Sequence, residues 1–521
     1  MKKESQSILI IDFGSQFTQL IARRVRENNV YCEIHPANKL DTEFVSNFNP
    51  MGIILSGGPS SVALDNFSTT KIDKNIFNLD IPILAICYGQ QLTCKMLGGK
   101  IDVDNNREFG QSYVKILQKS ELYDDIWKVN NEYKVWMSHG DHIVKAPDNF
   151  EKMATSDGAP FAIIANEEKK IYGLQFHPEV THTPEGKHII KNFLTKICGC
   201  QQTWNMHSFM DESIKNIREI VGNNKVICAV SGGVDSTVMA ALMHKAIGDN
   251  LTCIFIDTGL LRKNEGEIVK KRFQDKYHIP INYVNASSIF LKQLANINDP
   301  EQKRKIIGKI FIEIFDNEAK HIGGIKFLGQ GTLYPDIIES VSVNDNSAVT
   351  IKSHHNVGGL PKKMKLKLIE PLKDLFKDEV RLLGKELGID NELLSRHPFP
   401  GPGLAIRIIG DVNYERLNIL QEADHIYIQE LKKADLYNQI WQAFAVLLPI
   451  KSVGVMGDKR TYEYVLSLRA VTSTDGMTAD SFAFSHDFLK HVSSMIINNV
   501  QGINRVTYDV TSKPPSTIEW E

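Results

Sequence analysis

The sequence predicts an α/β protein with two domains, each built on a parallel sheet, followed by a small α+β domain. Three observations favour this fold class. Short apolar runs alternate with amphipathic stretches through the first two hundred residues, and the same alternation begins again near residue 225. The last part of the chain instead mixes helical periodicity with alternating strand patterns. With 521 residues, the chain has room for three or four domains of ordinary size.

Four apolar runs in the first domain each end in a loop, as the buried strands of a parallel sheet do. These runs are SILIIDFG (7–14), GIILSGGP (52–59), PILAICYG (82–89) and YGLQFHP (172–178). Ligands of such sheets bind beyond the carboxyl ends of the strands. We therefore expect the chemistry of this domain in the loops that follow these four runs.

Two changes of pattern predict the domain boundaries. The alternation stops around 198–205, and a Pro- and Gly-rich stretch, RHPFPGPGLAIR, occupies 396–407. Between them, KVICAV, LTCIFIDTG and IKFLGQGTLYPD each read as a strand that runs into a loop. The predicted domains are therefore 1–201, 202–396 and 397–521.

Composition narrows the classes of partner and compartment. The chain has 60 basic and 62 acidic residues, a net charge of −2, which gives no electrostatic case for nucleic acid or an anionic membrane as a partner. No apolar run reaches the ~18 residues of a membrane span, and the first residues do not resemble a signal peptide. We expect a cytoplasmic protein whose seven cysteines are reduced thiols.

Cys87 stands where the run 83–86 ends and Tyr88 and Gly89 follow. A single cysteine after a strand is typical of a buried core thiol. At the start of a helix, however, the helix dipole and free N–H groups stabilise a thiolate, and a nucleophilic cysteine then needs a base and an orienting group. The segment QFHPEV supplies both, since His177 and Glu179 are two residues apart on an extended stretch and can project the same way.

An oxyanion hole would complete this constellation. The loop LSGGPSS (55–61) places two glycines after another strand, where bare backbone N–H groups can face an oxyanion. We expect the N–H groups of Gly58 and Tyr88 to be the donors, because the residue after the nucleophile commonly supplies one of them.

Each of these motifs alone is weak evidence for a catalytic site. Together they resemble the motifs of the class I, triad-type glutamine amidotransferases. The residues that carry the resemblance are CYGQQ (87–91), HPE (177–179) and SGGP (56–59). The resemblance implies that Cys87 is the nucleophile, His177 the base and Glu179 its orienting group, in a glutaminase that releases ammonia through a glutamyl thioester. It also implies four residues that help to bind glutamine: Gln91, Ser138, His139 and Asp141.

The loop SGGVDST (231–237) follows a predicted strand and opens a predicted helix. Backbone N–H groups and the positive end of a helix make such a loop a phosphate cradle. The loop lacks the pattern G-x-x-x-x-G-K-[ST], so it does not indicate γ-phosphate transfer.

This loop resembles the PP-loop of N-type ATP pyrophosphatases, which cleave ATP between the α and β phosphates and adenylate an oxygen. The resemblance implies Mg²⁺ bound together with ATP, with Asp235 and Asp336 on the metal side, and Asp257 near the nucleoside. It also implies that the whole loop binds ATP: Ser231, Gly232, Gly233, Val234, Asp235, Ser236 and Thr237.

Four further segments resemble the family of glutamine-hydrolysing GMP synthases, and the similarity extends over the whole chain. They are IKSHHNVGGLP (351–361), RHPFPGPGLAIR (396–407), GDKRTYE (457–463) and KPPSTIEWE (513–521). The resemblance implies that xanthosine 5′-monophosphate (XMP) is adenylated at its 2-oxygen and aminated by ammonia to GMP. It implies XMP-binding residues and a lid: Arg262, Arg407, Lys513, Ile518 and Glu519 for XMP, and Lys352, His354 and His355 for the lid.

The same resemblance implies a homodimer formed through the C-terminal domain. The run AFAVLLPI (443–450) is apolar enough for an interface, but a buried strand explains it equally well.

Other functions stay open on the sequence. NAD synthetase and asparagine synthetase share the PP-loop domain but usually carry other glutaminase types, and CTP synthase activates its acceptor by γ-phosphoryl transfer. A nucleotide-sensing protein without catalysis would require a broken triad or loop, and neither is broken. The sequence also leaves open whether ammonia passes through a tunnel or after a domain rotation.

Overall fold

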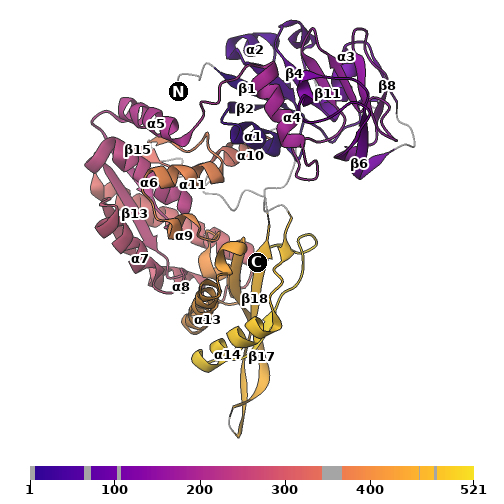
Figure 1. The fold of residues 1–521 in the computed structure, drawn as a ribbon. Helices are drawn as coiled ribbons and strands as arrows, with labels where there is room; N and C mark the ends of the chain where they lie inside the picture. Colours follow the sequence, from indigo (N-terminus) through magenta and orange to yellow (C-terminus); the bar gives the residue numbers. More distant parts are fainter. Residues whose placement is uncertain (1–5, 64–71, 103–106, 343–365, 457, 474–477) are drawn as a thin grey trace. The chain divides into compact units, whose positions relative to one another are not determined.

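The computed structural model forms two compact units, Met1–Phe209 and Met210–Glu521 (Figure 1). It describes residues 6–63, 72–102, 107–342, 366–456, 458–473 and 478–521. The predicted lid residues Lys352, His354 and His355 lie outside the described residues. A membrane-crossing helix is absent from the described parts of the chain, since none combines the length and the hydropathy that a span requires.

The first unit contains the predicted parallel sheet. The strands β1 (Ser7–Asp12), β3 (Gly52–Leu55), β4 (Ile83–Ile86) and β11 (Ile171–Leu174) are parallel neighbours in that order, with β2 (Tyr31–Pro36) beside β1. Apart from Asp12, every residue of these four strands is buried, which explains their continuous apolar runs. Their carboxyl ends meet at one edge of the sheet and bring the four predicted loops together.

Four antiparallel strands, which the sequence analysis did not predict, extend this sheet beyond β11. They are β10 (Ile163–Asn166), β9 (Glu151–Thr155), β6 (Glu108–Ile116) and β7 (Glu132–His139). Buried and exposed positions alternate along part of β6 and β7, as in a sheet with one face toward solvent.

Among its described residues, the first unit also contains a small sheet and four α-helices. A separate two-stranded sheet pairs β5 with β8. These elements have the following bounds: β5 (Lys100–Asp102), β8 (His142–Lys145), α1 (Thr18–Glu27), α2 (Thr42–Phe48), α3 (Tyr88–Met96) and α4 (Gly186–Asn192).

The second unit begins with a five-stranded sheet that is parallel throughout, as the sequence predicts. Its order is β14 (Ile281–Asn285), β13 (Leu251–Asp257), β12 (Lys225–Ala229), β15 (Ile325–Gly329) and β16 (Lys367–Ile369). The helices around it are α6 (Val234–Ile247), α7 (Glu265–Lys271), α8 (Ser287–Leu294), α9 (Pro300–Ile322), α10 (Tyr334–Ser342), α11 (Lys377–Glu386) and α12 (Asn391–Leu394). The helix α5 (Met206–Val221) contains the boundary between the units.

The end of the chain folds as the predicted α+β part. A long hairpin of β17 (Gln442–Met456) and β18 (Lys459–Thr472) is joined by β19 (Asp480–Ser481) and by β20 (Ile503–Tyr508), which runs parallel to β18 (Figure 1). The accompanying helices are α13 (Tyr414–Lys433) and α14 (His486–Asn499).

The two sheets of the second unit share one hydrophobic core. Ile227 and Ile254 from the parallel sheet belong to the same buried cluster as Ala443 and Leu466 from the hairpin. This common core explains why residues 210–521 group as one unit, and the boundary at 396/397 stays a prediction. The first half of the apolar run 443–450 is a buried strand: Ala443 and Ala445 belong to this core, and Phe444 and Val446 to a smaller buried cluster.

Candidate functional site

Cys87 occupies a strained turn between β4 and α3. Its backbone has φ +52° and ψ −106°, a conformation that residues other than glycine rarely adopt. Such strain costs about 1–3 kcal/mol and persists at sites where the surrounding structure enforces it. Gly89 makes the turn possible, because a Cβ atom there would lie 2.7 Å from the Leu55 carbonyl oxygen. The predicted nucleophile therefore has the strand–turn–helix geometry that the sequence indicated.

His177 and Glu179 form a buried pair beyond the end of β11. The Nδ1 atom of His177 lies 2.7 Å from Oε1 of Glu179, and the side chains are 5% and 0% exposed. The backbone N–H of His177 donates to the Trp136 carbonyl, and its own carbonyl accepts from Thr183 Oγ1. Burial opposes protonation, but the charges of Glu179 and Cys87 raise the pKa of His177 well above its ordinary value.

The thiol of Cys87 lies among groups from two other strand ends, those of β7 and β11. Its Sγ atom is 3.5 Å from the Ser138 carbonyl oxygen and 3.8 Å from Nε2 of Gln175. A Cβ atom at Gly57 would lie 3.2 Å from Cε1 of His177, so the SGGP loop also contacts the triad. The structure thus brings the predicted catalytic residues together at the carboxyl edge of the sheet.

The predicted oxyanion hole adjoins the same turn. A Cβ atom at Gly58 would lie 3.1 Å from the Tyr88 ring, so the two predicted donor residues are in contact. Among the described residues, the N–H of Gly58 has no hydrogen-bond acceptor. Both features are compatible with a donor aimed at an oxyanion.

The predicted glutamine-binding residues form a network of their own. Nε2 of Gln91 donates to the carbonyl oxygen of Asp141 at 2.8 Å and to Oε1 of Gln175 at 3.2 Å. His139 faces acceptors with both ring nitrogens, since Nδ1 lies 3.0 Å from the Asp141 carbonyl and Nε2 lies 3.2 Å from Oε2 of Glu108. Sequence reasoning missed Glu108 and Gln175, which come from an unpredicted strand and from the loop after β11.

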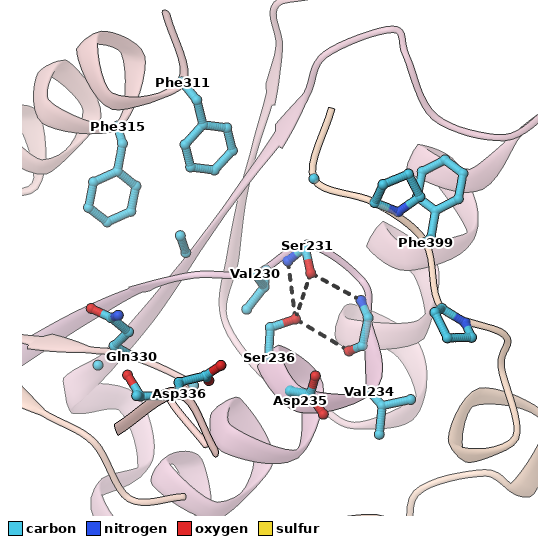
Figure 2. Close-up of a pocket in the computed structure, with 18 of the residues that line it drawn as sticks. Val230, Ser231, Val234, Asp235, Ser236, Phe311, Phe315, Gln330, Asp336 and Phe399 are labelled. Atoms are coloured by element: carbon cyan, nitrogen blue, oxygen red, sulfur yellow. Dashed lines mark hydrogen bonds between the residues drawn. The ribbon is translucent and has the colours of Figure 1, made fainter. Parts of the chain in front are cut away.

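In the second unit, the loop 231–237 is closed by hydroxyl groups (Figure 2). Oγ of Ser236 accepts from the Ser231 N–H at 3.2 Å and lies 3.1 Å from Oγ of Ser231, which accepts from the Gly233 N–H. Gly232 has φ +72°, and a Cβ atom there would lie 2.4 Å from Val269. These contacts hold the loop at the N-terminus of α6, as a phosphate cradle requires.

A cavity of about 380 Å³ opens beside this loop, within the usual range for ligand sites. Polar groups line one part of it, Phe311 and Phe315 line another, and Phe399 lies apart from these two rings (Figure 2). Such a division suits a nucleotide, which has an aromatic base and a charged phosphate chain. The predicted residues that line the cavity are Ser231, Gly233, Val234, Asp235, Ser236 and Asp336.

Three predicted ATP residues do not line this cavity. Thr237 is fully buried and donates to the Gly233 carbonyl oxygen at 2.7 Å, and Gly232 packs against Val269. The carboxylate of Asp257 accepts from the Gly259 N–H at 2.9 Å and from the Tyr283 hydroxyl at 2.5 Å. These residues shape the loops around the cavity.

The carboxylates at this cavity fit Mg²⁺ bound with ATP. Oδ1 of Asp235 is buried and has no hydrogen-bond partner among the described residues, and Oδ2 lies 3.3 Å from Nζ of Lys377. Asp336 lines the same cavity. No group of three or more His, Cys, Asp or Glu side chains in the described parts of the chain could hold a metal alone. Mg²⁺ commonly takes one or two protein carboxylates together with substrate phosphates and water. Asp235 and Asp336 can supply the carboxylates.

Arg262 and Arg407, two predicted XMP residues, are held by acidic partners. Nε of Arg262 lies 3.1 Å from Oδ2 of Asp424, and its terminal nitrogen donates to the Ala443 carbonyl. Arg407 is fully buried and donates two bonds to the carboxylate of Glu519, at 2.8 and 3.1 Å. Such two-point pairs fix both partners in one orientation.

The aromatic ring of Phe399 lies between the arginines and the cavity beside the loop 231–237. It lines the cavity and lies 5.1 Å from the guanidinium of Arg407 and 5.3 Å from that of Arg262. Ile518 packs in a buried cluster with Phe444, and the backbone of Lys513 pairs with that of Ala479. The structure therefore groups Arg262, Arg407 and Glu519 beside the cavity.

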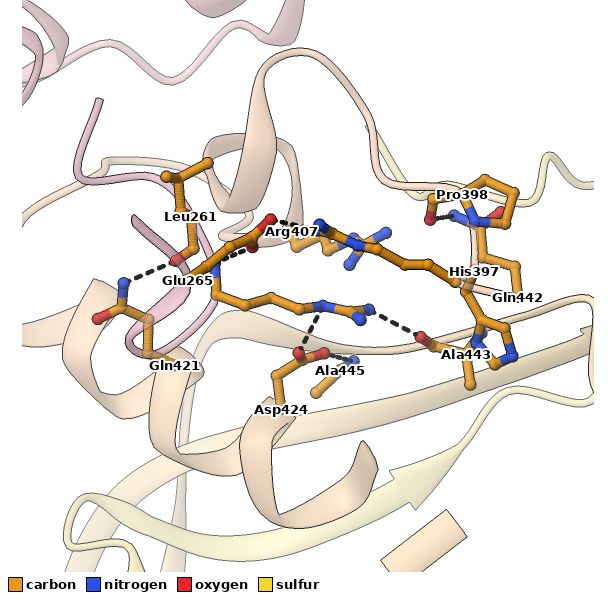
Figure 3. Close-up of polar contacts among 12 residues, drawn as sticks. Leu261, Glu265, His397, Pro398, Arg407, Gln421, Asp424, Gln442, Ala443 and Ala445 are labelled. Atoms are coloured by element: carbon orange, nitrogen blue, oxygen red, sulfur yellow. Dashed lines mark hydrogen bonds and ion pairs between the residues drawn. The ribbon is translucent and has the colours of Figure 1, made fainter. Parts of the chain in front are cut away.

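His397 is a buried neutral histidine in the same region (Figure 3). Its Nδ1 accepts from the Ala443 N–H at 3.2 Å, and its Nε2 lies 2.8 Å from the Tyr437 carbonyl oxygen. Burial and the charge of Arg262 lower the pKa of His397 to about 4. Sequence reasoning assigned no role to His397, Phe399 or Asp424, because nothing in the local pattern shows what packs against them.

Comparisons with known proteins match three parts of the chain to described families. Residues 9–197 match the family described as glutamine amidotransferase class-I, residues 224–287 match a tRNA methyl transferase HUP domain, and residues 429–520 match the GMP synthase C terminal domain. The second of these matches contains the loop 231–237.

Similar proteins extend over the whole chain. A protein of Phenylobacterium zucineum (strain HLK1) named GMP synthase (glutamine-hydrolyzing) is 57% identical over 518 residues, which cover 99% of each chain. One of the same name from Bartonella quintana (strain Toulouse) is 56% identical over 515 residues, again covering 99% of each. Among solved structures, a glutamine amidotransferase from Thermotoga maritima is 19% identical, with a TM-score of 0.31, and the match covers 37% of this chain and 99% of that protein.

Proposed function

The chain belongs to the family of glutamine-hydrolysing GMP synthases, and we propose how its residues divide the reaction between the two units. Glutamine is hydrolysed at a Cys-His-Glu triad to ammonia. ATP adenylates XMP with release of pyrophosphate, and ammonia then displaces AMP to give GMP. The single observation that carries the assignment is that one chain holds both a strained cysteine turn with a buried His–Glu pair and a hydroxyl-closed phosphate loop.

In the first unit, Cys87 attacks the amide carbon of glutamine. His177 gives its proton to the departing ammonia and then takes one from the water that hydrolyses the thioester. Glu179 holds the ring of His177 and stabilises its charged form, which the short distance between them supports. Gly58 and Tyr88 donate their N–H groups to the oxyanion. Glutamine binds near Ser138, whose carbonyl oxygen lies beside the Cys87 thiol, and near Gln91, His139 and Asp141, which are linked through the Asp141 carbonyl oxygen.

In the second unit, the loop 231–237 binds the phosphate chain of ATP, and the aromatic part of the cavity takes the base. Two observations support the proposal. Residues of the loop line the cavity, and the loop leads into the N-terminus of α6, which favours negative charge. Asp235 and Asp336 would hold Mg²⁺, which supplies positive charge toward the leaving pyrophosphate. Lys377, which lines the same cavity, holds the Asp235 carboxylate through an ion pair.

XMP binds where the arginines around Phe399 meet the segment 513–519. Arg262 is partly exposed, with 15% of its side chain accessible, so its charge can meet the nucleotide phosphate. Arg407 is fully buried and therefore acts by fixing Glu519. We assign Lys513 and Ile518 to the same site because they belong to the segment that ends at this carboxylate.

We also propose a homodimer in the cytoplasm. Apolar side chains are exposed in the far half of the β17–β18 hairpin, where Ile450, Val453, Val455 and Tyr462 are each more than half exposed. A second copy that covers this surface would remove it from water.

Separate inactivation of the two sites tests the proposal. Cys87→Ala should abolish GMP formation from glutamine and leave formation from added ammonium unchanged. Cys94→Ala is the matched control, because this buried cysteine of α3 should leave both activities intact. Asp235→Ala should stop synthesis from either nitrogen source while glutamine hydrolysis continues. If Cys87→Ala removed both activities, or Asp235→Ala neither, the assignment of the two sites would fail.

A further inference from the structure

Lys303, near the start of α9, is a fully buried lysine with 0% of its side chain exposed. Lysine is rarely buried so completely unless its charge is paired. Its Nζ atom donates to the carbonyl oxygens of Ala405 at 3.1 Å and Ile408 at 2.8 Å, and it forms an ion pair with the side-chain carboxylate of Glu521. Three acceptors therefore surround one ammonium group.

These acceptors come from the two segments that build the proposed XMP site. Ala405 and Ile408 flank Arg407, and Glu521 follows Glu519 by two residues. The other oxygen of the Glu521 carboxylate accepts from the Gly410 N–H at 3.4 Å. One buried ammonium thus ties together the segments that carry Arg407 and Glu519, which are far apart in sequence.

The charge of this ammonium is essential to the arrangement. Burial lowers the pKa of Lys303, and the carboxylate of Glu521 counteracts that effect. Without Lys303, the Glu521 carboxylate and two carbonyl oxygens would lose their common partner inside the protein. Unpaired buried groups of this kind are costly, so these segments would move apart or admit water.

We propose that Lys303 is a positioning residue for XMP: it fixes the main chain around Arg407 and the segment 518–521, so that Arg407 and Glu519 meet in the orientation that binds the nucleotide. The inference rests on the proposed XMP site. The inference predicts different effects on the binding of XMP and of ATP. The helix α9 contacts the proposed ATP cavity through other residues, among them Phe311 and Phe315, two and three turns further along. The loss of Lys303 should therefore weaken XMP binding more than ATP binding.

Steady-state kinetics of the full chain with ammonium as the nitrogen source test this inference. Lys303→Met should raise KM for XMP at least tenfold, while KM for ATP stays within twofold and glutamine hydrolysis is unchanged. Lys303→Arg, which keeps the charge, should recover part of the loss. Lys309→Met is the matched control, because this lysine of the same helix is 77% exposed and should leave every constant unchanged.

Glu521→Gln provides a second variant in case Lys303→Met fails to fold. It leaves Lys303 its two carbonyl partners and should raise KM for XMP in the same selective way. An unchanged KM for XMP in the variants that fold would overturn the inference, and so would an equal rise in KM for ATP, since that would indicate a general structural role.

Glu519→Gln separates the failure of this inference from failure of the proposed XMP site. If Glu519→Gln leaves KM for XMP unchanged, the proposed site itself is wrong. If Glu519→Gln raises it and Lys303→Met does not, the site stands and only the positioning role falls. If both raise it, the double variant should show less than the sum of the two free-energy changes, because the residues act through one arrangement.

Discussion

His177 and Glu179 face each other across 2.7 Å with Pro178 between them in the chain, and the carboxylate of Glu179 is fully buried. A buried carboxylate at this distance fixes the ring of the histidine and favours its charged form. The charge raises the pKa of His177 despite the opposing effect of burial. The base and its orienting group therefore lie within three consecutive residues.

Glu179→Gln should lower kcat for glutamine hydrolysis by about 10²–10⁴-fold, because the variant keeps the shape but loses the charge that orients and charges His177. Removal of the carboxylate lowers the pKa of His177, so the alkaline limb of the pH–rate profile should move to lower pH. Synthesis from ammonium should not change. These are measured as ammonia release against pH and as GMP formation from ammonium.

Glu185→Gln is the matched control for this variant. Glu185 lies 2.7 Å from His188 in a pair of the same type, but both side chains are about half exposed. Exposed pairs contribute little, so this change should affect neither rate nor profile. An unshifted profile in Glu179→Gln would remove the proposed electrostatic role of Glu179.

Gly232→Ala should abolish the ATP-dependent step. The backbone has φ +72°, and the added Cβ would lie 2.4 Å from a methyl group of Val269, so the loop must move. We expect pyrophosphate release to fall at least ~100-fold, equivalent to about 2.7 kcal/mol in the barrier, with glutamine hydrolysis retained.

Gly222→Ala separates the effect of the clash from that of backbone conformation. Gly222 also has positive φ, at +55°, but nothing lies within 4 Å of the added Cβ. This control should cost only the ~1–2 kcal/mol of the left-handed conformation in stability and leave pyrophosphate release intact. Similar losses of pyrophosphate release in both variants would show that the positive φ, and not the clash with Val269, causes the loss.

The sequence predicted those parts of the sites that depend on neighbours in the chain. Cys87, Glu179 and the loop 231–237 each follow a strand whose apolar run is unmistakable, and the structure places them as predicted at strand ends. Family resemblance added the reaction, which the comparisons confirm. Composition and net charge argued only against classes of partner, namely nucleic acid and anionic membranes.

Partners that are distant in sequence could not be predicted. Lys303 meets Glu521 across 218 residues, and Arg262 meets Asp424 across 162, so no local pattern encodes either pair. The antiparallel strands beyond β11 carry a weaker, partly exposed alternation, and with them Glu108 was missed. The shared core of the second unit likewise depends on contacts between two sheets.

Asp424→Asn should weaken XMP binding and destabilise the second unit. Asp424 is 1% exposed, and its loss would leave the Arg262 guanidinium without its buried counter-charge. Breaking a buried pair in this way costs about 3–5 kcal/mol. We expect a higher KM for XMP in ammonium-driven synthesis, together with a lower denaturant midpoint.

The adjacent pair Lys263–Glu422 provides the control for Asp424→Asn. Both of its side chains are 35% exposed, so Glu422→Gln should change stability by less than about 1 kcal/mol and leave KM for XMP alone. Equal effects of the two variants would mean that burial of the Arg262–Asp424 pair has no special role.

The pH dependence of the free energy of unfolding should show the titration of His397. Its neutral ring accepts from the Ala443 N–H and faces the Tyr437 carbonyl, and its pKa in the folded protein is about 4, against an ordinary value of 6.5. Above pH 6.5 the ring is neutral in both the folded and unfolded states. Between pH 6.5 and 4 the unfolded chain binds a proton that the folded chain excludes, so the free energy of unfolding falls as the pH falls, by up to roughly 3 kcal/mol.

His397→Gln should remove this pH-dependent loss, because the amide can form hydrogen bonds but does not titrate. We expect the variant to be less stable than the wild type at neutral pH, since the stacking of His397 on Tyr437 at 3.8 Å is lost, and the difference to narrow toward pH 4. Denaturant unfolding, followed by hydrogen exchange of peptides from residues 210–521, measures this for the second unit. His486→Gln, at an exposed histidine of the same unit, should keep the wild-type slope. A wild-type slope in His397→Gln would show that His397 is not the group responsible.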